Sequence, residues 1–219
     1  MKINTDGVLL GAIAGTGQPA TILDIGTGTG VIALMLAQRF TTATVDAVEI
    51  DEIAAHTAER NFTTSPFAGR MEIYATNFVS YFAQFPERKY DLIVSNPPFY
   101  IDSLKSPGAK KTLAKHTDRD FFERLIKTIS MHITPRGIGW LILPLETADI
   151  VMSLAAKLAL FPQRIVRVSS YPYSVPHRII VSLGFREVSA QISNLAIYEA
   201  KGLYSDAYQK LLQPYFLAF

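Results

Sequence analysis

The stretch Asp24-Ile-Gly-Thr-Gly-Thr-Gly30 decides the fold class of this chain. It follows a short run of β-branched and apolar residues, Thr21 to Ile25, and leads into Gly30 to Phe40, where apolar residues recur four positions apart. Glycines let a strand turn sharply into a helix and let the backbone approach a ligand, and the helix N-terminus presents free N–H groups. The stretch therefore predicts a strand, a ligand-binding turn and a helix, similar to the turn that binds dinucleotides. Because no Gly-Lys-Ser/Thr follows, it is not a Walker A phosphate loop.

Strand and helix patterns alternate along the rest of the chain, which is typical of a parallel sheet covered by helices. We predict strands at residues 21–25, 46–50, 70–74, 90–95, 137–143, 164–169 and 178–185, with a further short strand at 196–198. Helices are predicted at residues 8–14, 30–40, 52–62, 121–132, 147–160 and 205–212. With 219 residues and no linker or repeat, the chain is expected to form one α/β domain over residues 1–219.

The composition excludes several kinds of site. The chain is 49% hydrophobic and 18% charged, as in a packed globular protein, and it has no cysteine and four histidines. Disulfides, thiolate metal sites and a cysteine nucleophile are thereby excluded, and the scattered histidines argue against a zinc site. The apolar run Val8 to Gly15 is too short to span a bilayer. We expect a cytoplasmic protein without metal or membrane segment, acting as a monomer.

Charge is distributed unevenly along the chain. Residues 1–100 carry 6 basic and 10 acidic side chains, a balance of −4, whereas residues 101–219 carry 15 basic and 9 acidic ones, a balance of +6. The densest basic stretch comprises Lys105, Lys110, Lys111, Lys115, His116 and Arg119. Such a cluster can contact a phosphate backbone, and it can equally be a solvated lysine-rich loop. The charge pattern alone leaves both interpretations open.

The acidic residue that precedes the glycines narrows the choice of ligand. A carboxylate at Asp24 would repel a pyrophosphate but attract an α-ammonium group. This favours a cofactor that carries an amino acid over a dinucleotide. We assign Asp24, Gly26, Thr27, Gly28 and Gly30 to the site that binds this cofactor.

A second acidic segment, Glu49-Ile-Asp51, ends the next predicted strand. A carboxylate at that place can accept hydrogen bonds from both hydroxyls of a ribose. The alternative is that it caps the following helix, because a carboxylate near a helix N-terminus is stabilising. We predict ribose binding for Glu49, contact with the cofactor for Ile50, and helix capping for Asp51.

The motif Asn96-Pro-Pro-Phe99 directly follows the predicted strand 90–95. It lies where the switch point of a doubly wound sheet places its ligand crevice. Together with the glycine-rich turn and the Glu49 segment, this motif resembles the class I S-adenosylmethionine-dependent methyltransferases that act on amino groups. The resemblance separates this chain from the nicotinamide-dependent enzymes, which the glycine-rich turn alone leaves possible.

Three further segments resemble one family more closely, and the similarity covers essentially the whole chain. They are Asn4 to Ala12, Ala114 to Thr117, and the tail with Tyr204 to Tyr208 and Tyr215 to Phe219. They are similar to bacterial tRNA adenine-N(6)-methyltransferases that modify an adenosine beside the valine anticodon. The resemblance implies a class I methyltransferase (Rossmann-like) fold with a seven-stranded, mostly parallel sheet flanked by helices. It also implies S-adenosyl-L-methionine as cofactor and tRNA as substrate.

The residues at the motif suit methylation of an amine. The lone pair of an exocyclic adenine amine is delocalised into the ring, so the site must direct it at the methyl group. The side-chain oxygen of Asn96 and the carbonyl of Pro97 can accept the two N–H bonds, while Pro97 and Pro98 stiffen the loop. Phe99 offers an aromatic face for the target base. The alternatives are that Phe99 is plain core and that Asn96 is a turn residue.

Members of the family differ from this chain in two places. They carry an additional stretch ahead of the Thr-Asp-Gly motif, which here stands at residues 5–7. Their acidic residue after the third strand, which accepts the amino group of the cofactor adenine, is replaced by Asn77, so we expect a modest loss of cofactor affinity. Phe78 is expected to pack on the adenine ring or to be core. Thr5 is placed over the methionine end of the cofactor by the resemblance; from the residues alone, Thr5 or Asp6 is a helix N-cap.

A base within a duplex does not reach such a pocket, so the substrate nucleotide must lie in a loop or be flipped out. The basic stretch follows the Asn96 motif in sequence and is therefore expected at the mouth of the pocket, where phosphates pass. Arg164, Arg167 and Arg178 can extend that surface. Basic residues also protect an exposed edge strand from aggregation, which is the alternative for these arginines.

Two competing functions remain open at this stage. The first is the same chemistry on another amine or amide, in ribosomal RNA or on a protein glutamine, because the Asn-Pro-Pro-aromatic motif serves all of these. The second is a non-catalytic RNA-binding module that retains the fold, which weakened cofactor binding through Asn77 would favour. Cofactor affinity separates the two.

Overall fold

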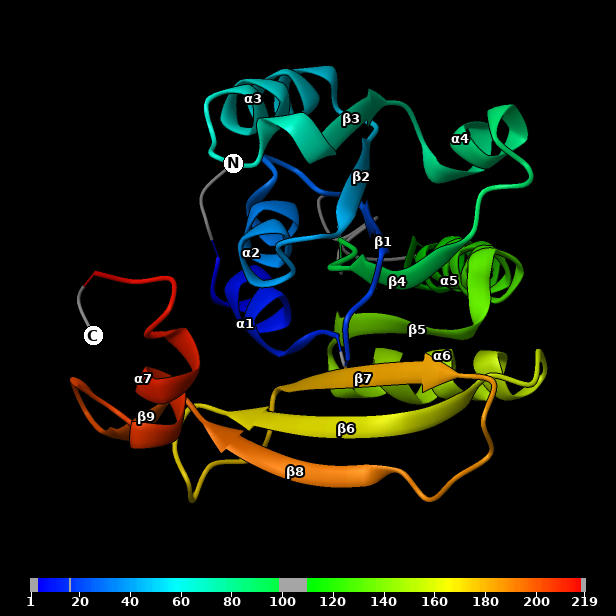
Figure 1. The fold of residues 1–219 in the computed structure, drawn as a ribbon. Helices are drawn as coiled ribbons and strands as arrows, with labels where there is room; N and C mark the ends of the chain where they lie inside the picture. Colours follow the sequence, from blue (N-terminus) through cyan, green and yellow to red (C-terminus); the bar gives the residue numbers. More distant parts are fainter. Residues whose placement is uncertain (1–3, 16, 99–109, 218–219) are drawn as a thin grey trace.

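The computed structural model describes residues 4–15, 17–98 and 110–217, with the backbone alone described for 110–118. Within this part of the chain, eight strands form one sheet in the order β3-β2-β1-β4-β5-β7-β6-β8, as Figure 1 shows. Its strands are β1 (Thr21–Ile25), β2 (Thr44–Glu49), β3 (Met71–Ala75), β4 (Tyr90–Ser95), β5 (Ile133–Leu143), β6 (Phe161–Ser169), β7 (Arg178–Gly184) and β8 (Gln191–Ala196). The predicted α/β class with a mostly parallel sheet is confirmed, with one strand more than the predicted seven.

The sheet is parallel except at one strand. β1 to β5 pair with parallel neighbours, and β6 pairs with β8 in parallel. β7 is antiparallel to both β5 and β6. The first residue of β7, Arg178, therefore lies at the carboxyl ends of the parallel strands. It is thus on the same side of the sheet as Glu49 and Ser95.

Helices cover both faces of the sheet (Figure 1). They are α1 (Thr5–Ile13), α2 (Val31–Arg39), α3 (Glu52–Thr63), α4 (Phe78–Gln84), α5 (Lys110–His132), α6 (Leu145–Ala156) and α7 (Asp206–Leu212), with a 3-10 turn at Ala68–Arg70. Side chains of α1, α2, α3 and α7 join the core on one face, and those of α4, α5 and α6 join the core on the other. Adjacent strand residues alternate between the two cores, as Leu92 and Ile93 do, which explains the continuous apolar runs in the sequence.

Several predicted features need correction. α5 begins at Lys110 rather than Phe121, and β5 at Ile133 rather than Gly137. α1 begins at Thr5 rather than Val8, and its N-cap is Asn4, whose side chain accepts a hydrogen bond from Gly7 N at 2.8 Å. α4 and β8 have no counterpart among the predicted elements. Because β8 pairs with β6, β6 is not an edge strand, so the edge-protecting alternative for its two arginines is wrong.

A pair of short strands follows the main sheet. β9 (Tyr198–Ala200) and β10 (Leu203–Tyr204) form an antiparallel hairpin beside α7, near the short strand predicted at 196–198. Ser205 caps α7 by accepting from Tyr208 N, and its hydroxyl donates to Ala196 O at 2.6 Å. The C-terminal region is thereby tied to the end of β8.

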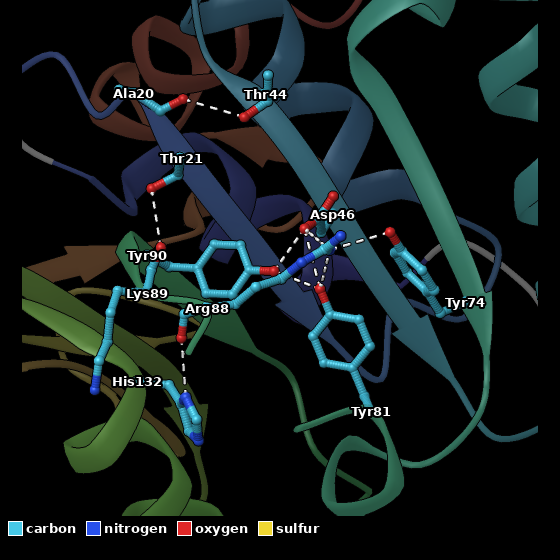
Figure 2. Close-up of polar contacts among 10 residues, drawn as sticks. All are labelled: Ala20, Thr21, Thr44, Asp46, Tyr74, Tyr81, Arg88, Lys89, Tyr90 and His132. Carbon is cyan, nitrogen blue, oxygen red and sulfur yellow. Dashed lines mark hydrogen bonds and ion pairs between the residues drawn. The ribbon is translucent and has the colours of Figure 1, made fainter. Parts of the chain in front are cut away.

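A partly buried polar cluster fixes α4 against one face of the sheet (Figure 2). The Asp46 carboxylate on β2 accepts hydrogen bonds from Tyr81 on α4, from Tyr90 on β4, and from Arg88 at 2.8 Å. The cluster joins three elements that are distant in sequence. It consequently holds the start of α4, and with it Phe78, at a fixed place beside the ends of β1 and β2.

Candidate functional site

A cavity of about 910 Å³ lies at the carboxyl ends of the central parallel strands. This is the switch point expected for a ligand in a doubly wound sheet, and the volume falls within the usual range for small-molecule pockets. Its lining comprises residues 4–7, 25–29, 31–32, 48–50, 76–78 and 95–98, together with Phe121, His177, Arg178 and Ile197. The glycine-rich turn, the Glu49 segment and the Asn96 motif therefore meet at one place.

The glycine-rich turn lies against the end of β2. Gly26 N and Thr27 N both donate to Val48 O, at 2.9 and 3.1 Å. Gly26 has a φ of 72°, and a Cβ added there would meet no atom within 4 Å, so the cavity approaches bare backbone at this point. Gly30 has a different role: its φ is 88°, and a Cβ would lie 2.4 Å from the Phe62 ring on α3. Gly30 allows α2 and α3 to pack closely and does not line the cavity.

Asp24 lies beneath the turn and is fully buried. Its Oδ2 accepts from Thr27 Oγ1 at 2.6 Å and from Ala33 N in the first turn of α2 at 3.2 Å. Burial raises the pKa of this carboxyl from 3.8 to about 7, and the two hydrogen bonds oppose that shift only in part. Asp24 is absent from the lining of the cavity, and its Oδ1 has no hydrogen-bond partner among the described residues. Its observed contacts hold the turn, and its contact with an ammonium group stays a prediction.

Glu49 connects the two loops of the cavity floor. Its Oε2 accepts from Gly28 N at 2.8 Å and its Oε1 accepts from Asp51 N at 2.9 Å. The residue is 8% exposed, and a carboxylate has about four acceptor positions, so capacity remains for further donors from the cavity. The neighbouring Ile50 is 71% exposed and lines the cavity. Asp51 caps α3 by accepting from Ala54 N, as predicted.

Asn77 and Phe78 form the wall opposite the glycine-rich turn. Asn77 is the N-cap of α4: its Oδ1 accepts from Ser80 N at 2.9 Å and its Nδ2 donates to Ser80 Oγ at 3.0 Å. This capping role was not foreseen, and it leaves the amide oxygen one further lone pair for a ligand. Phe78 meets Phe121 of α5 edge-to-face at 5.9 Å, and both rings line the cavity. The wall is therefore apolar with a single amide at its rim.

The Asn96 motif forms the third side. Ser95 Oγ donates to Ile25 O at 2.8 Å, which fixes the end of β4 against the end of β1. Asn96 Oδ1 is buried in the cavity wall, and no donor among the described residues lies within hydrogen-bond distance of it. A buried acceptor without a partner costs free energy, so its presence beside a cavity points to a ligand that donates to it. Pro97 is buried and Pro98 exposed, whereas Phe99 lies outside the described residues.

The starts of α1 and β7 meet at the remaining part of the lining. Thr5 and Asp6, at the start of α1, line the cavity, and Arg178 Nε donates to Asp6 Oδ2 at 2.7 Å. His177 and Ile197 lie beside this ion pair in the lining. Sequence reasoning missed the pairing, because the two partners are 172 residues apart and no local signal marks it.

The residues predicted to contact RNA stand in sequence between two residues that line the cavity, Pro98 and Phe121. Lys105 lies outside the described residues, as do the side chains of Lys110, Lys111, Lys115 and His116 in the first part of α5. Arg119 is exposed and pairs with Glu123 one turn along α5 at 3.2 Å, a surface contact of small energetic value. Arg119 stands two positions before Phe121, which lines the cavity.

Two classes of feature are absent from the described part of the chain. Its His, Asp and Glu residues form no group of three or more that could hold a metal ion. Among the same residues, no helix combines the length and hydrophobicity needed to cross a membrane.

Comparison with known proteins places this site in a family. The model of the methyltransferase small domain matches residues 6–142. The chain is 49% identical over 219 residues to the tRNA1(Val) (adenine(37)-N6)-methyltransferase of Pedobacter heparinus, covering 100% of this chain and 92% of that protein. It is 41% identical over 217 residues to the protein of the same name in Bacteroides fragilis, covering 99% and 91%.

Solved structures confirm the fold class. The structure described as a predicted O-methyltransferase from Agrobacterium tumefaciens matches with a TM-score of 0.72 at 17% identity, covering 95% of this chain and 96% of that one. The ribosomal protein L11 methylase of Lactobacillus delbrueckii subsp. bulgaricus matches with a TM-score of 0.58 at 17% identity, covering 83% and 78%. At these identities the likeness concerns the fold alone, which is that of a class I methyltransferase.

Proposed function

This chain belongs to the methyltransferase small domain family, and from that premise we propose that it transfers a methyl group from S-adenosylmethionine to the exocyclic amine of a tRNA adenosine. The observation that carries the proposal concerns the side-chain amide oxygen of Asn96, Oδ1. This acceptor is buried in the cavity wall and has no donor among the described residues. An amine with two N–H bonds is the group that such an acceptor and the adjacent Pro97 carbonyl would bind.

The cavity fits the cofactor residue by residue. The open space at Gly26 admits a ligand against bare backbone, and Glu49 has acceptor capacity for ribose hydroxyls. Phe78 and Ile50 offer apolar contact to an adenine ring, and the Asn77 amide stands at its edge. Thr5 and Asn96 line the same cavity. Gly28 and Thr27 complete the floor, while Asp24 and Gly30 act by holding that floor in shape.

The residues of this chain contribute mainly positioning. When bound, the sulfonium cofactor supplies an electrophilic methyl group. Asn96 and Pro97 accept the two N–H bonds of the amine and thereby direct its lone pair along the line of transfer. With the cofactor bound, the new N–C bond would form as the C–S bond breaks, and the methylated amine would lose a proton to water. No strong general base is required, because the nitrogen becomes acidic once it is alkylated.

The substrate class follows from the relatives and from charge. The relatives named above act, by their names, on adenine 37 of tRNA1(Val), and we propose the same nucleotide for this chain. The basic stretch from Lys105 to Arg119 is expected to bind phosphates near the mouth of the cavity. Phe99, between that stretch and Pro98, is proposed to stack on the flipped base. We further propose that residues 1–219 act as one domain, as a monomer without metal, in the cytoplasm.

The test is a methyl-transfer assay on unmodified bulk tRNA with methyl-labelled S-adenosylmethionine, followed by nucleoside mass spectrometry. Label in N(6)-methyladenosine, absent when Asn96→Ala replaces the wild type, supports the proposal. Cofactor binding without label in tRNA redirects the search to ribosomal RNA or protein glutamine. Absence of both binding and label indicates the non-catalytic RNA-binding module.

A further inference from the structure

Five tyrosine rings form a continuous series at one end of the sheet, which we call the tyrosine ladder. Its members in order are Tyr208, Tyr204, Tyr198, Tyr171 and Tyr173. Successive centroids are 5.0, 5.0, 5.8 and 5.4 Å apart, and three of the four contacts are stacked with interplanar angles of 5 to 19°. The series begins at Tyr208, which is 7% exposed in the core, and ends at Tyr173, which is 81% exposed.

The outer end of the ladder is held rigidly although it is exposed. Tyr173 lies in the loop between β6 and β7, and its ring stacks on Tyr171 at an interplanar angle of 5°. His177 N donates to Val168 O at 2.9 Å and closes the loop, and Ser174 N donates to Tyr171 O at 3.0 Å within it. Tyr198 N donates to Ser170 O at 2.9 Å, which joins the loop to β9. An exposed aromatic ring that is already ordered loses little conformational entropy when it binds a partner.

The ladder adjoins the candidate active site. Ile197, which lines the cavity, immediately precedes Tyr198 of the ladder. His177 and Arg178, which also line the cavity, follow Tyr173 by four and five residues, so at most about 18 Å of chain separates them. In Figure 1, three segments lie together at one end of the strands: strand β9, helix α7 and the loop that joins β6 to β7.

From this arrangement we propose that the ladder is a stacking platform for unpaired bases of the RNA substrate next to the one in the cavity. The inference deepens the proposed function and rests on it. Stacking on aromatic rings is the sequence-tolerant way in which proteins bind single-stranded RNA, and loop nucleotides are the ones with exposed faces. An RNA loop whose target base enters the cavity has neighbouring bases within reach of Tyr173.

The charged residues next to the ladder in sequence balance one another. Arg178 and Lys201 are offset by Glu199 and Asp206. Arg178 is already paired with Asp6, so the platform itself adds aromatic surface more than positive charge. Phosphate attraction is then supplied mainly by the basic stretch from Lys105 to Arg119, most of which lies in the first part of α5, and stacking by the ladder. The two surfaces divide the substrate between backbone and bases.

The experiment compares Tyr173→Ala with Tyr173→Phe, which retains the ring, and with Phe185→Ala. Phe185 is an exposed aromatic residue just beyond the opposite end of β7 and serves as the matched control. Binding of a fluorescent anticodon stem–loop and of a single-stranded uridine oligonucleotide is measured by anisotropy, and cofactor binding by calorimetry. We expect Tyr173→Ala to weaken RNA binding by about 5- to 150-fold, with Tyr173→Phe and Phe185→Ala near the wild type and cofactor affinity unchanged.

A second measurement locates the contact directly. 5-Iodouridine at loop positions is expected to crosslink to Tyr173 under ultraviolet light, and mass spectrometry identifies the residue. Equal RNA affinity of Tyr173→Ala and the wild type overturns the inference. If the RNA affinity is equal and the sedimentation of Tyr173→Ala differs from that of the wild type, the ladder is a protein interface instead. If the wild type binds RNA through Tyr173 but methylates no tRNA, the platform stands and the proposed function fails.

Discussion

The floor of the cavity and the tyrosine ladder are built on different physical principles. On the floor, polar groups such as Glu49 and Asp24 are buried and already hold backbone N–H groups, so the binding surface and the local fold are the same set of contacts. In the ladder, the outermost ring, Tyr173, is 81% exposed. It stacks on Tyr171 and is not part of the hydrophobic core. The floor lies within the part that matches the methyltransferase small domain, residues 6–142, and the ladder lies beyond it. We infer from this difference that substitutions at the cavity floor change both cofactor affinity and the stability of the fold. Substitutions at the outer end of the ladder can change RNA affinity without changing stability.

The largest effect is expected at Asn96 in the cavity wall, whose side-chain oxygen makes no hydrogen bond among the described residues. Asn96→Ala should lower methyl transfer by about 10³-fold, because the amine loses the acceptor that orients it. Cofactor affinity and melting temperature should stay near those of the wild type. Single-turnover rates and calorimetry provide the measurements. Retained turnover in this variant would refute the positioning mechanism.

A similarly large effect concerns Asp24 and pH. The pKa of this carboxyl is raised to about 7 in the fold from 3.8, so the folded state binds the proton more tightly than the unfolded state. Its contribution to stability is full below about pH 4, falls as pH rises to 7 and is then lost, a change of about 4 kcal/mol. Asp24→Asn removes this titration. Urea unfolding at pH 5 and pH 8 should therefore show the wild type losing more stability than the variant, and equal losses would contradict the assignment.

Two glycines of the turn separate packing from binding. Gly30→Ala should destabilise the fold by about 2–4 kcal/mol, because the new Cβ would lie 2.4 Å from Phe62 and because φ is 88°. Gly26→Ala meets no atom within 4 Å and should cost only about 1–2 kcal/mol of backbone strain, while it fills space that faces the cofactor. Denaturation and cofactor titration of both variants give the comparison. Equal stability losses would show that close packing at Gly30 is unimportant.

The smallest effect sharpens the contrast between the two regions. Glu49→Ala should weaken cofactor binding by about 1–3 kcal/mol, because hydrogen bonds from ribose hydroxyls to a charged acceptor are lost. Glu49→Gln retains one acceptor oxygen and should lie between the two. Binding of an RNA oligonucleotide should not change in either variant, unlike in Tyr173→Ala. An unchanged cofactor dissociation constant would refute the ribose assignment.

The sequence predicts the parts of the fold whose signals are local. β1 and β4 are predicted at Thr21–Ile25 and Tyr90–Ser95 with the bounds found, because buried parallel strands are continuous apolar runs that end at glycine or proline. The cap by Asp51 follows from its place before a helical pattern. The convergence of the glycine-rich turn, Glu49 and Asn96 follows from topology, since parallel strands bring their carboxyl ends to one edge.

What the sequence misses is set by distant contacts. β8 is a half-exposed edge strand with only Leu195 buried, so it lacks a periodic pattern. α4 is seven residues long and rich in aromatic rings, which favour strands by propensity, and it is fixed by Tyr81 in the Asp46 cluster. The pairing of Asp6 with Arg178 and the stacking of the tyrosines depend on the folded sheet. No spacing rule predicts them.

The ion pair between Asp6 and Arg178 also has a consequence for how the protein is made. Its partners lie 172 residues apart, so at bacterial rates of synthesis roughly 10 to 30 s pass between the appearance of the first and the second. Until β7 has been translated and inserted between β5 and β6, one wall of the cavity does not exist. A nascent or truncated chain can therefore form the glycine-rich turn early yet hold the cofactor poorly. Cofactor binding then stabilises finished molecules over interrupted ones.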